Sequence, residues 1–191
     1  MSSEKRKYEL KARAEGQEDT RRRIVQATME LHQEVGPART TIAEIARRAG
    51  VNRVTVYNHF PEESELVAAC QRHYLSLHPP PDLADELAIE DPAQRVRAVL
   101  RSLYRSYRER EPMAVKILRD RSAVPALDAL LAQTLDPAQA ALTDVVAASL
   151  GRGRRKRALV ALALDFWTWH RLTSEGLSDN EAADLMAQLL G

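Results

Sequence analysis

One stretch, residues 40–66, constrains the fold of this chain more than any other part of its sequence. Thr41 and Glu44 have the spacing of a capping box, so a helix is predicted to begin at Thr41. The apolar residues that follow recur every three or four positions, which gives this helix one inward face. Gly50 is expected to end it, because glycine enters a left-handed C-terminal turn at low cost.

A second short helix, over residues 53–59, is predicted directly after this glycine. Asn52 can serve as its N-cap, and Val51 and Val56 are spaced as a hydrophobic staple around the cap. Two helices joined by a tight glycine turn indicate a helix-turn-helix, whose second helix enters the major groove of DNA. We expect Val54, with Val51 before it as a further candidate, to anchor this second helix to the first. The polar residues left to meet bases and phosphates are Arg53, Thr55, Tyr57, Asn58 and His59.

The stretch also carries a more specific pattern of residues. The pattern consists of Thr41, Ile45, Ala46, Ala49, Gly50, Val51, Thr55, Val56, Tyr57, His59, Phe60, Glu65 and Leu66, in register with a helix expected over residues 24–36. With these residues the stretch resembles the DNA-binding domain of the TetR (tetracycline-repressor) family. The resemblance covers roughly a third of the chain. The remainder is similar to the family only in helical plan and length.

This resemblance implies an all-α protein of about nine to ten helices in three parts. The expected parts are a flexible basic arm over residues 1–18, a DNA-binding domain over 19–66, and a ligand-binding and dimerisation domain over 67–191. We expect a homodimer whose two recognition helices read a palindromic operator in double-stranded DNA. Besides the polar residues of the second helix, the expected DNA contacts are Arg21, Arg22, Thr40, Thr41 and Asn52.

The distribution of charge favours the same end of the chain for DNA. The net charge is only +1, but residues 1–60 carry twelve Lys and Arg against eight Asp and Glu. Residues 1–18 lack a sustained apolar period, and two interpretations of them stay open: a disordered or partly helical arm that touches DNA, or a solvated tail. Three consecutive arginines, residues 21–23, are expected at the start of the first helix. Cations there oppose the helix dipole, which indicates an anionic partner.

The helix after the helix-turn-helix departs from the family pattern. Family members commonly have a lysine that pairs with phosphate where this chain has Glu63, which puts that contact in doubt. The backbone amides at this helix start can still face a phosphate. His32 stands where the family usually has phenylalanine, and we expect a buried neutral histidine there, with a regulatory proton as the alternative.

Prolines predict where the later helices begin and end. Three consecutive prolines, residues 79–81, should end the helix expected over residues 62–77, and Pro92 should begin the next. Pro112 is expected to restart the chain, and Pro137 to divide two shorter helices. Short helices with proline breaks suit a bundle around a pocket for an apolar or aromatic small molecule. The candidate pocket residues are Cys70, His73, Tyr104, Tyr107, Met113, Trp167 and His170.

The last part of the chain is predicted to form a helical hairpin, with helices over residues 157–175 and 178–190. The first of these is apolar on several faces, as a helix that serves both the core and a dimer interface requires. The expected dimerisation residues are Leu159, Leu162, Phe166, Trp169, Leu185 and Leu189. The basic run over residues 152–157 precedes them, and we interpret it as an exposed loop and helix start rather than as a nucleic-acid contact.

These features together favour a transcriptional regulator. We expect a repressor that a small-molecule effector releases from its operator; the alternative is a DNA-binding dimer whose C-terminal domain holds no ligand and acts through protein partners. An enzyme is not expected, since the sequence has no phosphate-binding glycine loop, nucleophile elbow or HExxH motif. One cysteine excludes an internal disulfide. No metal, cofactor or membrane association is expected, and the location is expected to be cytoplasmic.

Overall fold

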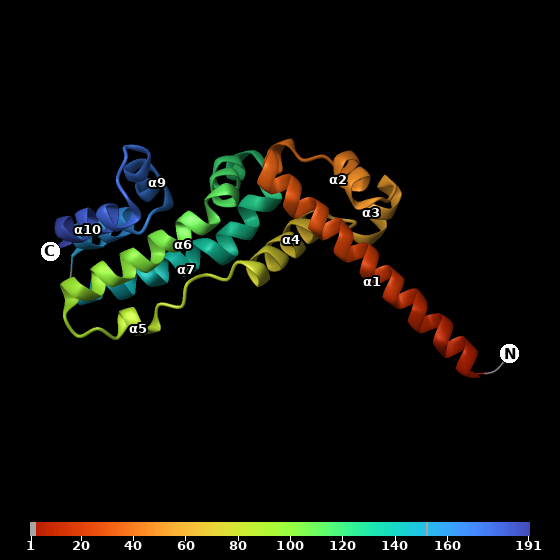
Figure 1. The fold of residues 1–191 in the computed structure, drawn as a ribbon, viewed down its shortest axis with the longest axis horizontal. Helices are drawn as coiled ribbons and strands as arrows, with labels where there is room; N and C mark the ends of the chain where they lie inside the picture. Colours follow the sequence, from red (N-terminus) through yellow and green to blue (C-terminus); the bar gives the residue numbers. More distant parts are fainter. Residues whose placement is uncertain (1–2, 152) are drawn as a thin grey trace. The chain divides into compact units, whose positions relative to one another are not determined.

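Helices make up most of the residues that the structure, a computed structural model, describes, which are 3–151 and 153–191 (Figure 1). No strand occurs in this part of the chain, and its ten α-helices confirm the all-α prediction of nine to ten helices. No helix within it is both long enough and apolar enough to cross a membrane. The α-helices are α1 (Ser3–Glu34), α2 (Ile42–Ala49), α3 (Arg53–His59), α4 (Glu63–Leu77), α5 (Ala84–Leu87), α6 (Pro92–Asp120), α7 (Pro125–Ser149), α8 (Arg154–Ala163), α9 (Phe166–Ser174) and α10 (Asp179–Leu190), with 3-10 turns at Pro37–Arg39 and Arg121–Ala123.

The helices form two compact units. The first contains the described residues up to 78 together with 115–130, and the second contains 79–114 together with the described residues from 131 to 191. Helices α6 and α7 therefore each contribute residues to both units. The N-terminal unit thus takes in a segment that lies about 40 residues further along the chain, which the expected division at residue 66 did not include.

The first helix is longer than the sequence indicated. Helix α1 runs from Ser3 to Glu34 without a break, so the described part of the expected flexible arm is helical, while residues 1 and 2 lie outside the described residues. The three arginines at positions 21–23 consequently stand in the middle of a helix and not at its start. Their charges therefore do not oppose the dipole of α1.

The core of the first unit lies where α1 packs against α2 and α4. Ile24, Ile45 and Leu66 are almost completely buried in it. Helix α3 is anchored to this core by Val56, which is 0% exposed, and Val51 packs against the same cluster. The prediction that Val54 anchors α3 is wrong, because its side chain is 65% exposed.

The ends of α2 and α3 follow the expected capping residues. The Thr41 hydroxyl accepts the Glu44 amide proton at 3.2 Å, and the Asn52 side chain accepts that of Thr55 at 2.8 Å. Gly50 has φ 67°, the left-handed value for which glycine is favoured. The capping box at Thr41 is only half formed, because the Glu44 carboxylate pairs instead with Arg47.

The prolines break the later helices less often than predicted. Helix α4 ends at Leu77, before the proline run, and α6 begins at Pro92, as expected. Pro112, however, lies inside α6, and Pro137 lies inside α7. An internal proline costs about 3 kcal/mol by removing a helical hydrogen bond, so tertiary packing of these long helices must outweigh it.

The second unit has a helix break that was not predicted, at Leu164 and Asp165 between α8 and α9. The sequence prediction of one helix over residues 157–175 is therefore wrong. Asp165 caps α9 by accepting the Thr168 amide proton at 3.0 Å. The carbonyls at the end of α8 are paired with side chains of the same unit: Tyr104 donates to the Ala163 oxygen at 2.8 Å and Tyr107 to the Leu164 oxygen at 2.6 Å.

Candidate nucleic-acid interface

Helix α3 presents a polar face to solvent. The side chains of Arg53 and Asn58 are exposed, and that of Tyr57 is 53% exposed. None of the three makes a side-chain hydrogen bond or ion pair with any residue that the structure describes. Their donors and acceptors are thus free for base edges and phosphates, the groups that a recognition helix meets in the major groove.

The other polar residues of the motif hold its geometry. The Asn52 carboxamide oxygen accepts from both the amide and, at 3.0 Å, the hydroxyl of Thr55, so these two fix the start of α3. His59 is half-buried at the last turn of the helix. Thr40 donates its hydroxyl to the Gly36 carbonyl at 2.9 Å, and Thr41 is exposed beside its cap.

Sequence reasoning missed one residue of this face. Val54 lies two positions before the buried Val56, and two positions correspond to about 200° around a helix. Its apolar side chain is therefore held in solvent among the polar residues. An exposed valine on such a helix can contact the methyl group of thymine, which is the apolar feature of the major groove. The periodicity of the short helix was the available signal.

The arginines of α1 hold the ends of α2 and α3. Arg21 donates from Nη1 to the carbonyl oxygen of His59 at 2.7 Å, and its guanidinium lies 4.0 Å from the centre of the Phe60 ring. Arg23 donates to the carbonyl oxygen of Ala49 at 2.5 Å. Cations are favourable at helix C-termini, where unpaired carbonyls and the dipole are negative. These contacts set the orientation of α3, whereas Arg22 is exposed and pairs with Asp19.

The loop before α2 is hydrogen-bonded to the later segment of the same unit, residues 115–130. The buried carboxylate of Asp120, at the end of α6, accepts the backbone amide proton of Ala38 at 3.0 Å. Arg119 pairs with this carboxylate and donates to the carbonyl oxygen of Val35 at 3.2 Å. The hydrogen bond from Arg119, together with that from Ala38, holds the pKa of Asp120 below its usual value, so it stays ionised.

Beneath the helix-turn-helix, His32 is buried against Cys70. Its Nδ1 atom lies 3.7 Å from the Cys70 sulfur. Burial lowers the pKa of His32 to about 4, although the charge of Asp120 acts in the opposite direction, and burial raises the pKa of the Cys70 thiol to about 12. A neutral histidine beside a protonated thiol is ordinary core packing at neutral pH.

The residues expected to line a ligand pocket are divided between the two units. Cys70 and His73 belong to the first, where the His73 ring is 2.8 Å from the side-chain oxygen of Gln26. The others belong to the second, and Tyr104 and Met113 are buried there. The His170 ring lies 3.6 Å from Glu111 and is edge-on to Trp167, which is 41% exposed.

The expected dimerisation residues differ in exposure. Phe166 and Trp169 are buried at 5% and 0% exposure, and Trp169 donates its indole N–H to Asp179 at 3.0 Å. Neither offers surface to a partner, because both serve the core of the protomer. The neighbouring apolar side chains that do reach solvent lie on α8, α9 and α10, and they are Leu159, Leu162, Trp167, Leu185 and Leu189.

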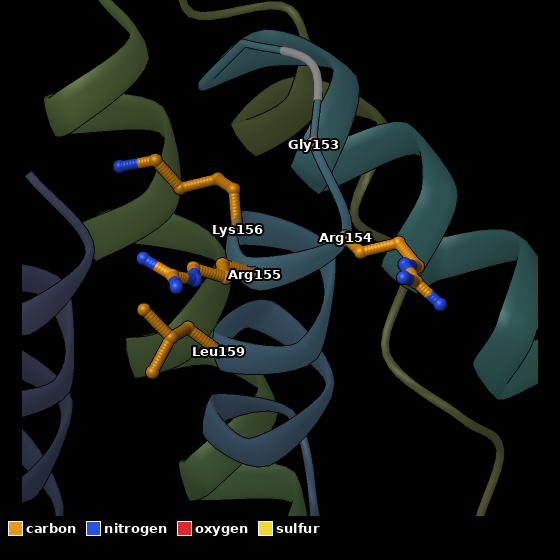
Figure 2. Close-up of a pocket in the computed structure, with 5 residues that line it drawn as sticks. All are labelled: Gly153, Arg154, Arg155, Lys156 and Leu159. Atoms are coloured by element: carbon orange, nitrogen blue, oxygen red, sulfur yellow. The ribbon is translucent and has the colours of Figure 1, made fainter.

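The basic run begins α8, as expected for an exposed helix start, although Arg152 lies outside the described residues. Figure 2 shows Arg155, Lys156 and Leu159 on one side of α8 and Arg154 on another, around a hollow that these residues line with Gly153. Lys156 donates to the carbonyl oxygen of Leu190 at 2.5 Å and so ties α8 to the end of α10. This run therefore has a structural role in the second unit.

Comparison with known proteins places the helix-turn-helix in a family. Residues 24–70 match the family model described as bacterial regulatory proteins, tetR family. The chain is 35% identical over 86 residues to the HTH-type transcriptional regulator BetI 1 of Chromohalobacter salexigens, a match that covers 42% of the chain and 40% of that protein. It is 41% identical over 76 residues to the HTH-type transcriptional regulator SrpR of Pseudomonas putida, over 38% of the chain and 36% of the relative. The matched stretch thus spans about two fifths of these curated relatives.

The fold as a whole has a counterpart among solved structures. The crystal structure of a transcriptional regulator from Rhodococcus sp. Rha1 aligns with 89% of this chain and 95% of its own, with a TM-score of 0.55 and 21% identity. At that identity the likeness concerns the fold alone. The two curated relatives are both named transcriptional regulators, in agreement with the expectation of a protein that is not an enzyme.

Proposed function

We propose, from the premise that this chain belongs to the TetR family, that it is a sequence-specific DNA-binding transcriptional regulator. The observation that carries this proposal is the outward face of α3, where Arg53, Tyr57 and Asn58 are exposed without intramolecular partners. A helix that buries one apolar anchor, Val56, and leaves a polar face of this kind in solvent is suited to insertion into a groove.

The residues of the motif are assigned separate tasks. Arg53 is the candidate for a bidentate contact with guanine, which contributes about 1–3 kcal/mol of discrimination. Val54 is the candidate for a thymine methyl. The phosphate contacts that position the helix fall to Arg22, Thr40 and Thr41, and Thr55, Tyr57, Asn58 and His59 divide the remaining phosphate and base contacts.

The proposed active species is a homodimer. The exposed apolar side chains of α8 and α10 support this, since Leu162 and Leu189 are 52% and 62% exposed and would be covered by a second copy. Two recognition helices related by a two-fold axis would then read a palindromic operator with half-sites about 34–36 Å apart, or a multiple of that distance.

The proposed regulation is release of the operator by a small-molecule effector bound in the C-terminal part. The two-unit organisation supports it, because a ligand that favours one arrangement of the recognition helices would shift the dimer away from operator binding. The expected pocket residues, including Cys70, His73, Tyr104, Tyr107, Met113, Trp167 and His170, remain candidates for contact with an apolar or aromatic ligand.

A second candidate is a regulator whose C-terminal part holds no ligand and acts through protein partners. One observation favours it: the hydroxyls of Tyr104 and Tyr107 and the indole N–H of Trp169 are all paired within the protomer. Polar groups spent in this way are not available to orient a ligand unless these bonds are broken.

The deciding experiment is binding of the purified protein to DNA from around its own gene, at several salt concentrations, with Arg53→Ala and Tyr57→Ala alongside. We expect saturable binding to a palindromic site, and loss of sequence preference in Arg53→Ala. Arg105→Ala, which removes an exposed arginine of the second unit, is the control and should bind as the parent does. Binding that is indifferent to sequence and to both α3 substitutions would refute the assignment. If sequence-specific binding is found, a screen for compounds separates the two candidates: a compound that weakens operator binding favours the ligand-regulated repressor over the regulator without a ligand.

A further inference from the structure

We propose that a second basic surface on the first unit binds the sugar-phosphate backbone of DNA beyond the half-site read by α3. This flank surface consists of Arg13, Gln17 and Arg21 on α1 with Ser64 and Arg72 on α4. The inference rests on the proposed function and adds to it a phosphate-binding site that the recognition helix does not supply.

The first part of the flank surface is a row along α1. Arg13, Gln17 and Arg21 are four residues apart and therefore lie along one side of the helix. Arg13 and Gln17 are exposed, and Arg21 is half-buried.

The acidic residues of this part of α1 lie on other sides of the helix. Glu15, Glu18 and Asp19 are about 100° or more around α1 from Gln17. Two of them are also neutralised locally: Glu15 is 3.8 Å from Lys11, and Asp19 pairs with Arg22. The row is therefore the cationic side of a helix that is otherwise mixed in charge.

The second part is a surface hollow between α1 and α4. Arg21 and Arg72 line it together with Ser64, Glu65 and Ala68. Two guanidinium groups and a hydroxyl are donors suited to a phosphate, whose oxygens accept charge-assisted hydrogen bonds. Glu65 opposes an anion, but the lining still carries a net positive charge.

The flank surface is continuous with the recognition helix. Arg21 donates to the carbonyl oxygen of His59, the last residue of α3, and stacks on Phe60. The same side chain lines the hollow, so the hollow begins where α3 ends. All these residues belong to one compact unit, so a duplex bound by α3 would meet the hollow next to the end of that helix.

The chemistry of the surface selects DNA over a protein partner. Ala68 is the one apolar residue among those that form the row and line the hollow, whereas protein interfaces need an apolar centre. Helix α1 also projects beyond the other helices of its unit (Figure 1), and residues 11–18 are all exposed. An isolated helix of this length is marginal in water, and phosphate contacts would stabilise it.

The surface also accounts for the acidic start of α4. At the position where the family pattern implies a lysine for phosphate, this chain has Glu63, an exposed acid. Arg72 and Ser64 on the same helix supply the missing donors from a different position. The distance from Arg13 to Arg21 is eight residues, or about 12 Å of helix, which corresponds to three to four base pairs of duplex at about 3.4 Å each.

The test compares Arg13→Gln, Arg72→Gln and the double variant with the parent protein. Both side chains are exposed, so the substitutions should leave stability within about 0.5 kcal/mol. Arg21 is not substituted, because it also holds the end of α3. Arg105→Gln removes the same charge from the second unit, and Arg72→Lys restores a cation in the hollow.

Binding to the operator and to an unrelated duplex is measured against salt concentration. We expect each flank substitution to lower the slope of log Kobs against log salt by about one per protomer, on both duplexes, because the lost contact is to phosphate. Arg105→Gln should leave the slope unchanged, and Arg72→Lys should largely restore it. In the double variant, the stretch of DNA that the protein protects from hydroxyl radicals should be three to four base pairs shorter on each outer flank.

A parental slope and an unchanged footprint in the double variant would overturn the flank surface. That failure is distinct from failure of the proposed function, which Arg53→Ala reports. If Arg53→Ala abolishes sequence preference while the flank variants keep the parental slope, the regulator stands and the flank surface does not. If no sequence preference exists but the flank variants still lower the slope, the flank surface stands as a general DNA contact.

Discussion

Two regions of this molecule put similar polar side chains to opposite uses. On α3, Tyr57 is half-exposed and makes no intramolecular hydrogen bond in the described part of the chain, whereas Tyr104 and Tyr107 of the second unit are spent on carbonyls of their own protomer. From the sequence all three tyrosines suggested binding. The difference shows that a tyrosine in the sequence does not by itself indicate a ligand, because a hydroxyl bonded to a nearby carbonyl stabilises the fold instead.

The largest effect on stability is expected from substitution of Trp169, and a much smaller one from substitution of its neighbour Trp167. Trp169→Ala should lower the free energy of unfolding by about 3–5 kcal/mol, since it removes a fully buried ring that stacks with Arg108 and donates to Asp179. Trp167→Ala should cost about 1 kcal/mol or less, because that ring is 41% exposed. Urea unfolding at one fixed protomer concentration measures both. Equal losses would mean that Trp167 is buried at a dimer interface.

The burial of His32 in the first unit should make the stability of the protein depend on pH. Burial holds the pKa of His32 at about 4 in the folded protein, against about 6.5 in the unfolded chain. Between these values only the unfolded chain takes up the proton, so stability falls as pH falls from about 6.5 to 4, by about 3 kcal/mol in total.

His32→Phe should remove this part of the pH dependence. The measurement is the difference in unfolding free energy between parent and variant at several pH values, which cancels the carboxylates that both share. A difference that stays constant from pH 7 to 4 would show that His32 is not buried as a neutral ring. The first unit would then be more open than this structure has it.

A smaller effect should separate Tyr104, which is buried, from Tyr107, which is half-buried. Tyr104→Phe leaves the Ala163 carbonyl without its donor and should cost about 1–3 kcal/mol. Tyr107→Phe should cost less, because the Leu164 carbonyl also accepts from Gln139 at 3.0 Å. Thermal unfolding with the two variants side by side tests the order. Unchanged stability with an altered response to compounds would instead assign the hydroxyls to a ligand.

The smallest effect concerns two helix caps, one in each region. Asn52→Ala and Ser178→Ala should each cost about 1 kcal/mol, since both side chains accept an amide proton at a helix start. Only Asn52→Ala should also weaken operator binding, because it loosens the start of α3. Anisotropy titrations alongside unfolding curves check this pair. Weakened DNA binding in Ser178→Ala would show that the second unit influences the first.

Local signals explain which parts of the fold could be predicted. Asn52 and Gly50 act on the residues beside them, so the boundaries of α2 and α3 followed from sequence. The same holds for Ser178 and Glu181, whose reciprocal capping box begins α10. On α3, the exposure of Arg53, Tyr57 and Asn58 agrees with the sequence prediction, but the prediction placed Val54 rather than Val56 as the buried anchor.

The remainder depends on contacts between distant segments, which no local pattern reports. Pro112 and Pro137 read as breaks but lie within helices, while the real break at Asp165 depends on tyrosines about 60 residues earlier. The roles of Arg21 and Arg23 were hidden for the same reason, since their acceptors are the carbonyls at the ends of α3 and α2.

The hydrogen bond between Asp120 and Ala38 has a consequence for biosynthesis. The first unit includes residues 115–130, so the helix-turn-helix lacks part of its compact unit until the ribosome has made them. Domains generally fold during synthesis as their sequence is completed, and the first unit here is completed only after the first part of the second has emerged. A nascent chain stalled at residue 78 should therefore be more open to proteases than one stalled beyond residue 130.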